Sequence, residues 1–210
     1  MHVGYGSFSM KSVRNLHDEY RKKFAVPTKW TTDFPAYYTY TVRILRQKER
    51  SAVGVFGGMT STGGRIYYSD YSGYAGTDNL MSMRFLGATA AFAYDVKKFV
   101  VSPGFMFANY WNSMQIYSYQ QLTGKPLVAS TTEWLSNTFV IGPTVEVRRS
   151  FGPLVLMLNA GYELSIFKEK MHSADQKALF IVDNNKDFIR VSVNGFRVSG
   201  GVGIAIGERN

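Results

Sequence analysis

Apolar and polar side chains alternate along residues 137–164, in two runs joined by the turn sequence RRSFG at 148–152. One face of each run is apolar, as Leu156 illustrates, and the other is polar and carries Glu146 and Glu163 in mid-run. Successive side chains of a strand point to opposite faces. The two-residue period therefore predicts an antiparallel hairpin with one apolar and one polar face.

The same period recurs along the whole chain and predicts eight strands. They span about 2–10, 36–47, 51–68, 80–95 and 99–119, the two runs of the hairpin, and 189–206. Short connections are predicted at 48–51, 96–99 and 148–152, and long ones at 11–35, 69–79, 120–131 and 167–187. Alternating short and long connections are typical of an up-and-down antiparallel barrel with both termini at the short-turn end. A single domain over residues 1–210 is expected.

The period is interrupted at two places. Met81, Met83 and Phe85 are out of phase with the apolar positions of 86–94, and the last strand changes phase near 194–196. A β-bulge shifts the phase of a strand by one residue, so a bulge is predicted at each place.

The distribution of charge decides which face is expected to be inside. The apolar faces are nearly free of charge, whereas the opposite faces are small or polar and carry Arg43, Arg84, Glu146, Glu163 and Arg197. A soluble barrel that binds an apolar ligand should show the reverse. The pattern favours a transmembrane β-barrel with lipid outside and a polar lumen. The lumen charges are expected to pair, Arg43 with Glu146 and Arg84 with Glu163, since a buried unpaired charge is costly. A gated polar path or a ligand site is the alternative use of these groups.

Composition excludes several other classes. The chain has 45% hydrophobic and 19% charged residues, and its net charge of +9 is not gathered into a stripe, so no nucleic-acid partner is expected. It has no cysteine, which excludes disulfides and zinc–thiolate sites. The sequence has no apolar run of about 18 residues, so no transmembrane helix is predicted. Residues 1–8 do not resemble a signal peptide. The acidic run at 182–187 lacks the full calcium-loop pattern, so no metal or cofactor is expected.

The first long connection contains a predicted amphipathic helix at 9–24. Its apolar positions recur at steps of three and four residues: Met10, Val13, Leu16, Tyr20 and Phe24. Its other faces carry a basic set that could contact lipopolysaccharide phosphates: Lys11, Arg14, Arg21, Lys22 and Lys23. The alternative is a helix that covers the mouth of the barrel and keeps its charges in water.

Three glycine- and aromatic-rich segments carry a resemblance to a known family. They are GYGSFSM near the start, GGMTSTGGRIYYSDYSG at 57–73 and RVSGGVGIAIG at 197–207. In these segments the chain resembles the small eight-stranded outer-membrane barrels of Gram-negative bacteria, of the OmpA and OmpX type. The resemblance implies a monomer in the bacterial outer membrane, with extracellular loops and periplasmic termini, in contact with membrane lipid and lipopolysaccharide.

The function expected from these observations is structural or surface-interacting rather than enzymatic. A lipid A-modifying enzyme is one alternative, because His17 and His172 could act with a serine and an acid such as Ser69 and Asp70, or with Ser72 or Ser173. A soluble lipocalin-like ligand-binding barrel and a small pore are the others.

Overall fold

The computed structural model describes the backbone of residues 1–23 and 29–206 and the side chains of 1–22 and 33–206. The Lys23 side chain, Phe24 of the predicted helix and Gly207 of the last resembling segment lie outside the described parts.

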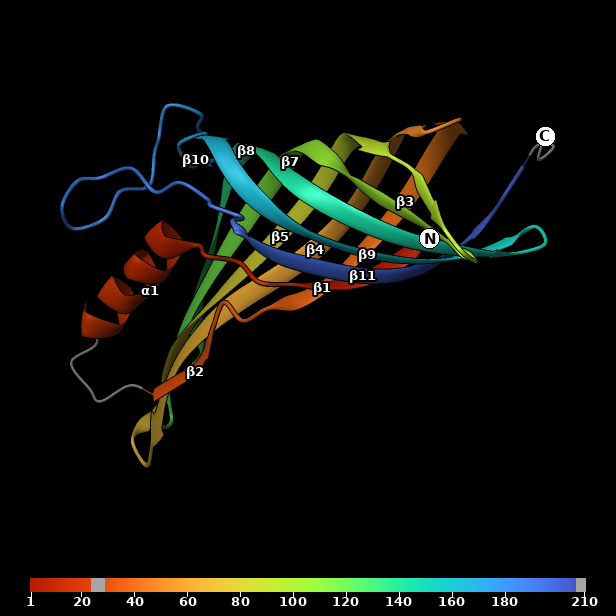
Figure 1. Ribbon diagram of the computed structural model, residues 1–210. Coiled ribbons are helices and arrows are strands. Elements are labelled where there is room, and N and C mark those ends of the chain that lie inside the picture. The colour runs from red at the N-terminus through yellow and green to blue at the C-terminus, as the bar shows by residue number, and fades with distance from the viewer. Residues whose placement is uncertain (24–28, 207–210) are drawn as a thin grey trace.

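Eight strands pair antiparallel into a closed hydrogen-bonded ring in the order β1–β3–β4–β5–β7–β8–β9–β11, with β11 pairing back to β1 (Figure 1). The bounds are β1 (His2–Gly6), β3 (Tyr37–Lys48), β4 (Ser51–Asp70), β5 (Gly73–Phe92), β7 (Phe99–Leu122), β8 (Val128–Phe151), β9 (Leu154–Lys168) and β11 (Gly195–Ile204). The prediction of eight antiparallel strands is confirmed.

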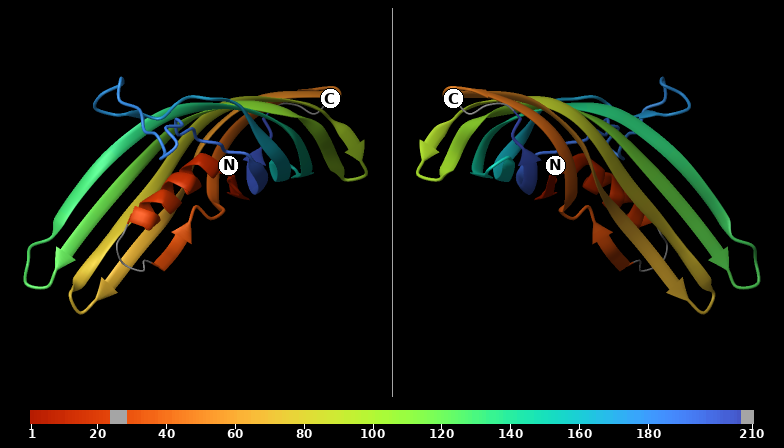
Figure 2. Two further views of the ribbon diagram at one scale, coloured as in Figure 1. Left: turned by 90° about the vertical axis from the view of Figure 1, so that its left-hand side faces the viewer. Right: turned by 90° about the vertical axis from the view of Figure 1, so that its right-hand side faces the viewer.

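Four shorter elements complete the described chain: α1 (Lys11–Lys23), β2 (Lys29–Asp33), β6 (Tyr94–Val96) and β10 (His172–Ser173). The three strands pair with ring strands, β2 with β4, β6 with β7 and β10 with β8. The predicted short helix in the first connection is confirmed. It lies at the end of the ring from which the long segments leave (Figures 1 and 2).

The connections differ between the two ends of the ring. At the end we call the short-turn end, the loops at 49–50, 97–98 and 152–153 each have two residues. At the opposite loop end, the predicted long connections at 69–79 and 120–131 are wrong. β4 pairs with β5 until Asp70 faces Gly73, and β7 pairs with β8 until Gln120 faces Val128. Apolar and polar side chains do not alternate clearly in these segments, which are rich in glycine and in small polar residues, so the sequence pattern did not distinguish them from loops.

The side chains of the ring are arranged with apolar groups outside. Ile44, Phe105 and Leu158 on the outer face are 71%, 69% and 56% exposed, whereas Glu146 and Glu163 on the inner face are 3% and 5% exposed. The interior is also partly apolar, and its buried aromatic and methionine side chains form one core with α1. The apolar face of the hairpin at 137–164 therefore points outward, as predicted. The expectation of a mainly polar interior is wrong, because part of the interior is an apolar core.

The polarity of the two faces reverses toward the loop end of the four longest strands. There the inner face gains buried apolar side chains on β4, β5 and β7, namely Ile66, Met81, Met83, Met114 and Ile116, among buried polar ones such as Thr77 and Asn79. The outer face carries polar groups, among them Arg65, Asp78, Ser82, Gln115 and Glu133. This extension packs on α1 through Val13 and Leu16, so the apolar interior is its core.

Neither of the two phase changes along the sequence is a β-bulge. β5 pairs with β4 and β7 in unbroken register through Met81, Met83 and Phe85, which all face inward. Val193 is buried but precedes the first residue of β11, so the phase changes where the chain enters the strand, and β11 pairs with β9 without a shift. Both predicted bulges are therefore wrong, and the register shift of the β8–β9 pair lies between residues 139 and 140.

Candidate functional site

A first layer of charged side chains crosses the ring interior near the short-turn end. Arg43 of β3 forms an ion pair with Oε2 of Glu146 on β8, and Nε of Arg148 lies 3.3 Å from Oε1 of the same carboxylate. Arg148 also donates to Oε1 of Gln47 at 2.8 Å and to Oγ of Ser102 at 3.1 Å. One buried carboxylate therefore holds two guanidinium groups from opposite sides of the ring.

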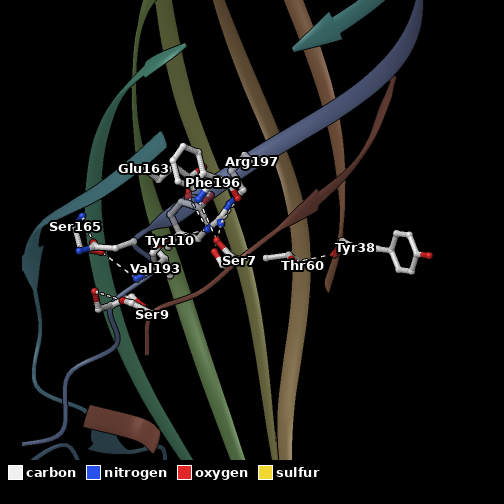
Figure 3. A network of polar contacts seen from close by, with 12 residues as sticks. Ser7, Ser9, Tyr38, Thr60, Tyr110, Glu163, Ser165, Val193, Phe196 and Arg197 are labelled. Atoms are coloured by element: carbon white, nitrogen blue, oxygen red, sulfur yellow. Dashed lines mark hydrogen bonds and ion pairs between the residues drawn. The ribbon is translucent and has the colours of Figure 1, made fainter. Parts of the chain in front are cut away.

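A second layer lies closer to the loop end (Figure 3). The Tyr110 hydroxyl donates to both carboxylate oxygens of Glu163, at 2.9 and 3.0 Å, and Nη2 of Arg197 pairs with Oε2 at 2.9 Å. Tyr110 comes from β7, Glu163 from β9 and Arg197 from β11, so this cluster ties three strands together. The buried carboxylate has both a neutral and a charged donor, as a desolvated acid requires.

Arg197 also anchors the two chain segments that fill the loop end. Nη1 donates to the carbonyl oxygen of Ser7, Nη2 donates to that of Val193 at 2.9 Å, and the guanidinium carbon lies 4.4 Å from the centre of the Phe8 ring. The Ser9 hydroxyl, which is drawn in Figure 3, donates to the Ser192 hydroxyl at 3.1 Å and so joins the same two segments. The second layer therefore fixes the segments that lead into and out of the interior core.

A cavity of about 80 Å³ lies between the two layers. Arg43 lines it on the side of the first layer, and Tyr110, Glu163 and Arg197 line it on the side of the second. Its wall also includes small and hydroxylated side chains and one imidazole: His2, Gly4, Thr41, Thr144 and Ser199. A buried water needs roughly 10–15 Å³ of such volume, so a few waters fit, whereas a drug-sized ligand does not.

The structure brings together some of the predicted lumen charges and not others. Arg43 and Glu146 pair as predicted, and Glu163 and Arg197 both lie in the second layer. Arg84 is an exception, because it is exposed on the outer face, where it stands beside Trp111 in the β5–β7 register. Its predicted pairing with Glu163 is wrong, since the alternation of β5 points residues 81, 83 and 85 inward.

Sequence reasoning missed two members of the layers. Arg148 was assigned to the turn 148–152, although it has the same strand parity as Glu146 and therefore faces inward. Tyr110 was not singled out, although it alternates with the outward Trp111. In both cases the two-residue period of the strand indicates that the side chain points inward.

The basic set of α1 is mostly engaged within the protein. Arg14 donates to the Phe34 carbonyl at 2.8 Å and lies 3.7 Å from an Asp33 carboxylate oxygen, so it holds the helix to the following segment. Arg21 and Lys22 pair with Asp18 at 2.9 and 2.8 Å. Lys11 is exposed.

The residues considered for catalysis lie on separate elements. Asp70 accepts hydrogen bonds from Ser72 and Tyr68 at the tip of the β4–β5 hairpin, and these contacts shape the turn. His172 lies on β10, far from that tip, as Figures 1 and 2 show, and its Nδ1 is 3.1 Å from the carbonyl oxygen of Ser173.

His17 is fully buried in α1, 3.7 Å from Asp33 and edge-on to the Phe34 ring. Burial lowers the pKa of its imidazole below the usual value, against the opposing effect of the Asp33 carboxylate. A neutral imidazole in this position is part of the packing of the helix.

Two further searches cover the described part of the chain. None of its clusters of histidine, aspartate and glutamate side chains could hold a metal ion. None of its helices is long and apolar enough to cross a membrane.

Comparisons with known proteins assign no family: no protein-family model and no curated protein matches the chain. The class is defined by the fold and the interior alone. It is an all-β antiparallel protein with a closed ring of eight strands, one short helix near the N-terminus, an apolar outer face and two charged layers inside.

Proposed function

We propose that this protein is an integral β-barrel of the bacterial outer membrane with a structural or surface-interacting role. The observation that carries the proposal is the exposed apolar outer face. Water-exposed apolar surface on this scale is unfavourable, at roughly 25 cal/mol per Å², and hydrocarbon is the medium that makes it favourable. A closed ring supports the same proposal, because a spanning sheet must leave no unpaired edge in lipid.

The height of the apolar band agrees with a bilayer. On β7 the outward side chains are apolar, apart from Asn109, between Phe99 and Trp111. A rise of about 3.3 Å per residue makes this stretch about 40 Å long, and a tilt of about 45° reduces its height to about 28 Å. The hydrocarbon core of a bilayer is about 30 Å thick.

The change of polarity along the longest strands supports one boundary of the proposed membrane. Beyond Arg84 and Trp111 the outer face becomes more polar and the inner face more apolar. Tryptophan and arginine are residues that favour the interface between lipid and water. In this proposal the extension, α1 and the segment 169–194 stand outside the cell, and the exposed Lys11 and Lys22 are the members of the basic set placed to contact lipopolysaccharide phosphates.

The interior supports a scaffold rather than an enzyme or a pore. Both charged layers are internally paired, and the apolar core with α1 fills the loop end. We therefore propose a monomeric barrel whose extended hairpins and long connections meet partners at the cell surface, with no catalytic step.

The test uses two neighbouring residues of β11 in a chain without cysteine. Val198 is 52% exposed on the outer face, whereas Ser199 lines the cavity. A nitroxide is attached to Val198→Cys or to Ser199→Cys in vesicles, and the two variants are compared for collision with lipid-soluble oxygen and with a water-soluble nickel chelate. We expect oxygen to relax only the label at 198 strongly. Equal relaxation, or a folded protein that stays in buffer without detergent, would favour the soluble ligand-binding alternative.

A further inference from the structure

The short-turn end carries a concentration of exposed cations. Three consecutive two-residue turns, β3–β4, β6–β7 and β8–β9, lie along the neighbouring ring strands β3, β4, β5, β7, β8 and β9, with β6 pairing to β7 where β5 ends. We call the cations on and beside these turns the basic collar: Arg46, Lys48, Arg50, Lys97, Lys98 and Arg149. The first five are exposed, and Arg149 is half-buried. On the same turns only Glu49 and Asp95 carry carboxylates, so the end has an excess of positive charge.

The cations of the collar have few internal partners. None of the six forms an ion pair with another described residue, whereas Arg21, Lys22 and Arg65 near the loop end pair with Asp18 or Asp78. Cations without internal carboxylate partners are available to an external anion, and the attraction is strongest where water is partly excluded.

The collar lies where the apolar outer band ends. Arg46 follows Ile44 on the outer face of β3, and Arg149 lies between outward Val147 and Phe151 on β8. The Arg149 guanidinium carbon is 4.7 Å from the centre of the Phe151 ring and 5.4 Å from that of the Phe99 ring. These exposed rings hold the planar cation at the rim of the band. A guanidinium held in this way can offer two parallel N–H groups to a phosphate.

We propose that the basic collar binds anionic glycerophospholipid headgroups of the leaflet that meets the short-turn end. This inference rests on the proposed membrane location and adds a lipid partner and an orientation to it. The acyl chains of such a lipid lie against the apolar band, and its phosphate lies among the collar cations. The short-turn end then faces the leaflet that contains anionic phospholipid.

The test measures lipid selectivity of the full chain in vesicles. Spin-labelled phosphatidylglycerol and spin-labelled phosphatidylcholine are compared by the fraction of each that is immobilised at the protein surface. We expect a preference for phosphatidylglycerol of about threefold, because its headgroup carries a net negative charge that the phosphatidylcholine headgroup does not. The preference should fall toward one as salt rises from about 0.1 to 1 M and the Debye length shortens from about 10 to 3 Å.

Matched variants assign the effect to the collar. The collar variant combines Lys48→Gln, Arg50→Gln, Lys97→Gln and Lys98→Gln, all on exposed turns. The control variant removes the same charge from exposed positions beyond the opposite end of the ring with Lys125→Gln, Lys177→Gln, Lys186→Gln and Arg190→Gln. We expect the control to keep the preference and the collar variant to lose most of it. Arg149→Gln alone should weaken it, because the ring-held guanidinium is removed.

The outcomes separate this inference from the proposed function. A wild-type protein that inserts into vesicles and shows no preference, or a collar variant that keeps the preference, overturns the lipid site and leaves the membrane location standing. Failure of the protein to enter vesicles of either composition overturns the proposed function, and the lipid site with it.

Discussion

Arg43 and Glu146 are 103 positions apart in the sequence, and their side chains form an ion pair inside the ring. β3 and β8 are separated by three strands in either direction around the ring, so this contact joins opposite walls. Arg148 shares the same carboxylate. Removal of that one acid therefore leaves two buried guanidinium groups uncompensated.

Glu146→Gln should lower the free energy of unfolding by about 3–5 kcal/mol, the usual cost of breaking a buried ion pair from one side. Urea unfolding in vesicles would measure it. Glu133→Gln is the matched control, because Glu133 faces outward and accepts a hydrogen bond from Ser113 at 2.6 Å. The control should cost less than about 1 kcal/mol. Equal losses of unfolding free energy for the two variants would contradict a stabilising role of the ion pair across the ring.

Tyr110→Phe should cost about 1.5–3 kcal/mol, the range for a hydrogen bond to a charged group. Glu163 keeps its ion pair with Arg197 in this variant. Glu163→Gln should cost more and should also loosen the segments that Arg197 anchors. Amide hydrogen exchange near Ser7 and Val193 would then rise in Glu163→Gln and stay close to wild type in Tyr110→Phe. Faster exchange in Tyr110→Phe than in Glu163→Gln would contradict the role of Arg197 in holding these two segments.

A charge in the middle of the apolar band should be poorly tolerated. Leu158→Lys should lower the free energy of unfolding in vesicles by about 2–4 kcal/mol, the cost of a lysine at the midplane of a membrane barrel. Gln115→Lys, on the outward face of the extension, is the control and should change it by less than about 0.5 kcal/mol. A lysine at 158 that proves as mild as one at 115 would show that the band does not contact lipid.

Packing of α1 should weaken in acid. Burial lowers the pKa of His17 in the folded protein, so below the unfolded value of about 6.5 the unfolded state binds the additional proton and stability falls with pH. Above that value the imidazole is neutral in both states and its contribution is constant. Proteolysis of the helix segment should therefore accelerate between pH 7.5 and 5. His17→Leu should flatten this dependence, and an unchanged profile would exclude His17 as its source.

Close strand contact at Gly142 should make a side chain there costly. A Cβ at this position would collide with the Tyr162 carbonyl oxygen, whereas one at Gly200 would meet nothing within 4 Å. Gly142→Ala should therefore destabilise the protein by about 1–3 kcal/mol, as overpacking does, and Gly200→Ala should be nearly neutral. Thermal or urea unfolding of the two variants compares them directly, and equal stability would contradict the packing at 142.

The sequence by itself determined the eight strands, the short turns and the outward direction of the apolar faces. These follow from the two-residue period, which is a local property of a strand. It also predicted the Arg43–Glu146 pair, because strand parity points both side chains inward and an eight-strand order places their strands opposite each other. The same period indicates that the side chains of Arg148 and Tyr110 point inward, although the sequence analysis predicted neither.

Only the tertiary structure decided where the two faces exchange their polarity. Met81 and Met83 look misplaced along the strand, and they become interior when α1 packs over the extended hairpins. The same packing decided the partner of Glu163. Arg197 reaches it from the neighbouring strand, whereas Arg84 is turned outward by the parity of β5. Partners of this kind depend on contacts between distant segments, and the period of a single strand does not record which segment will cover it.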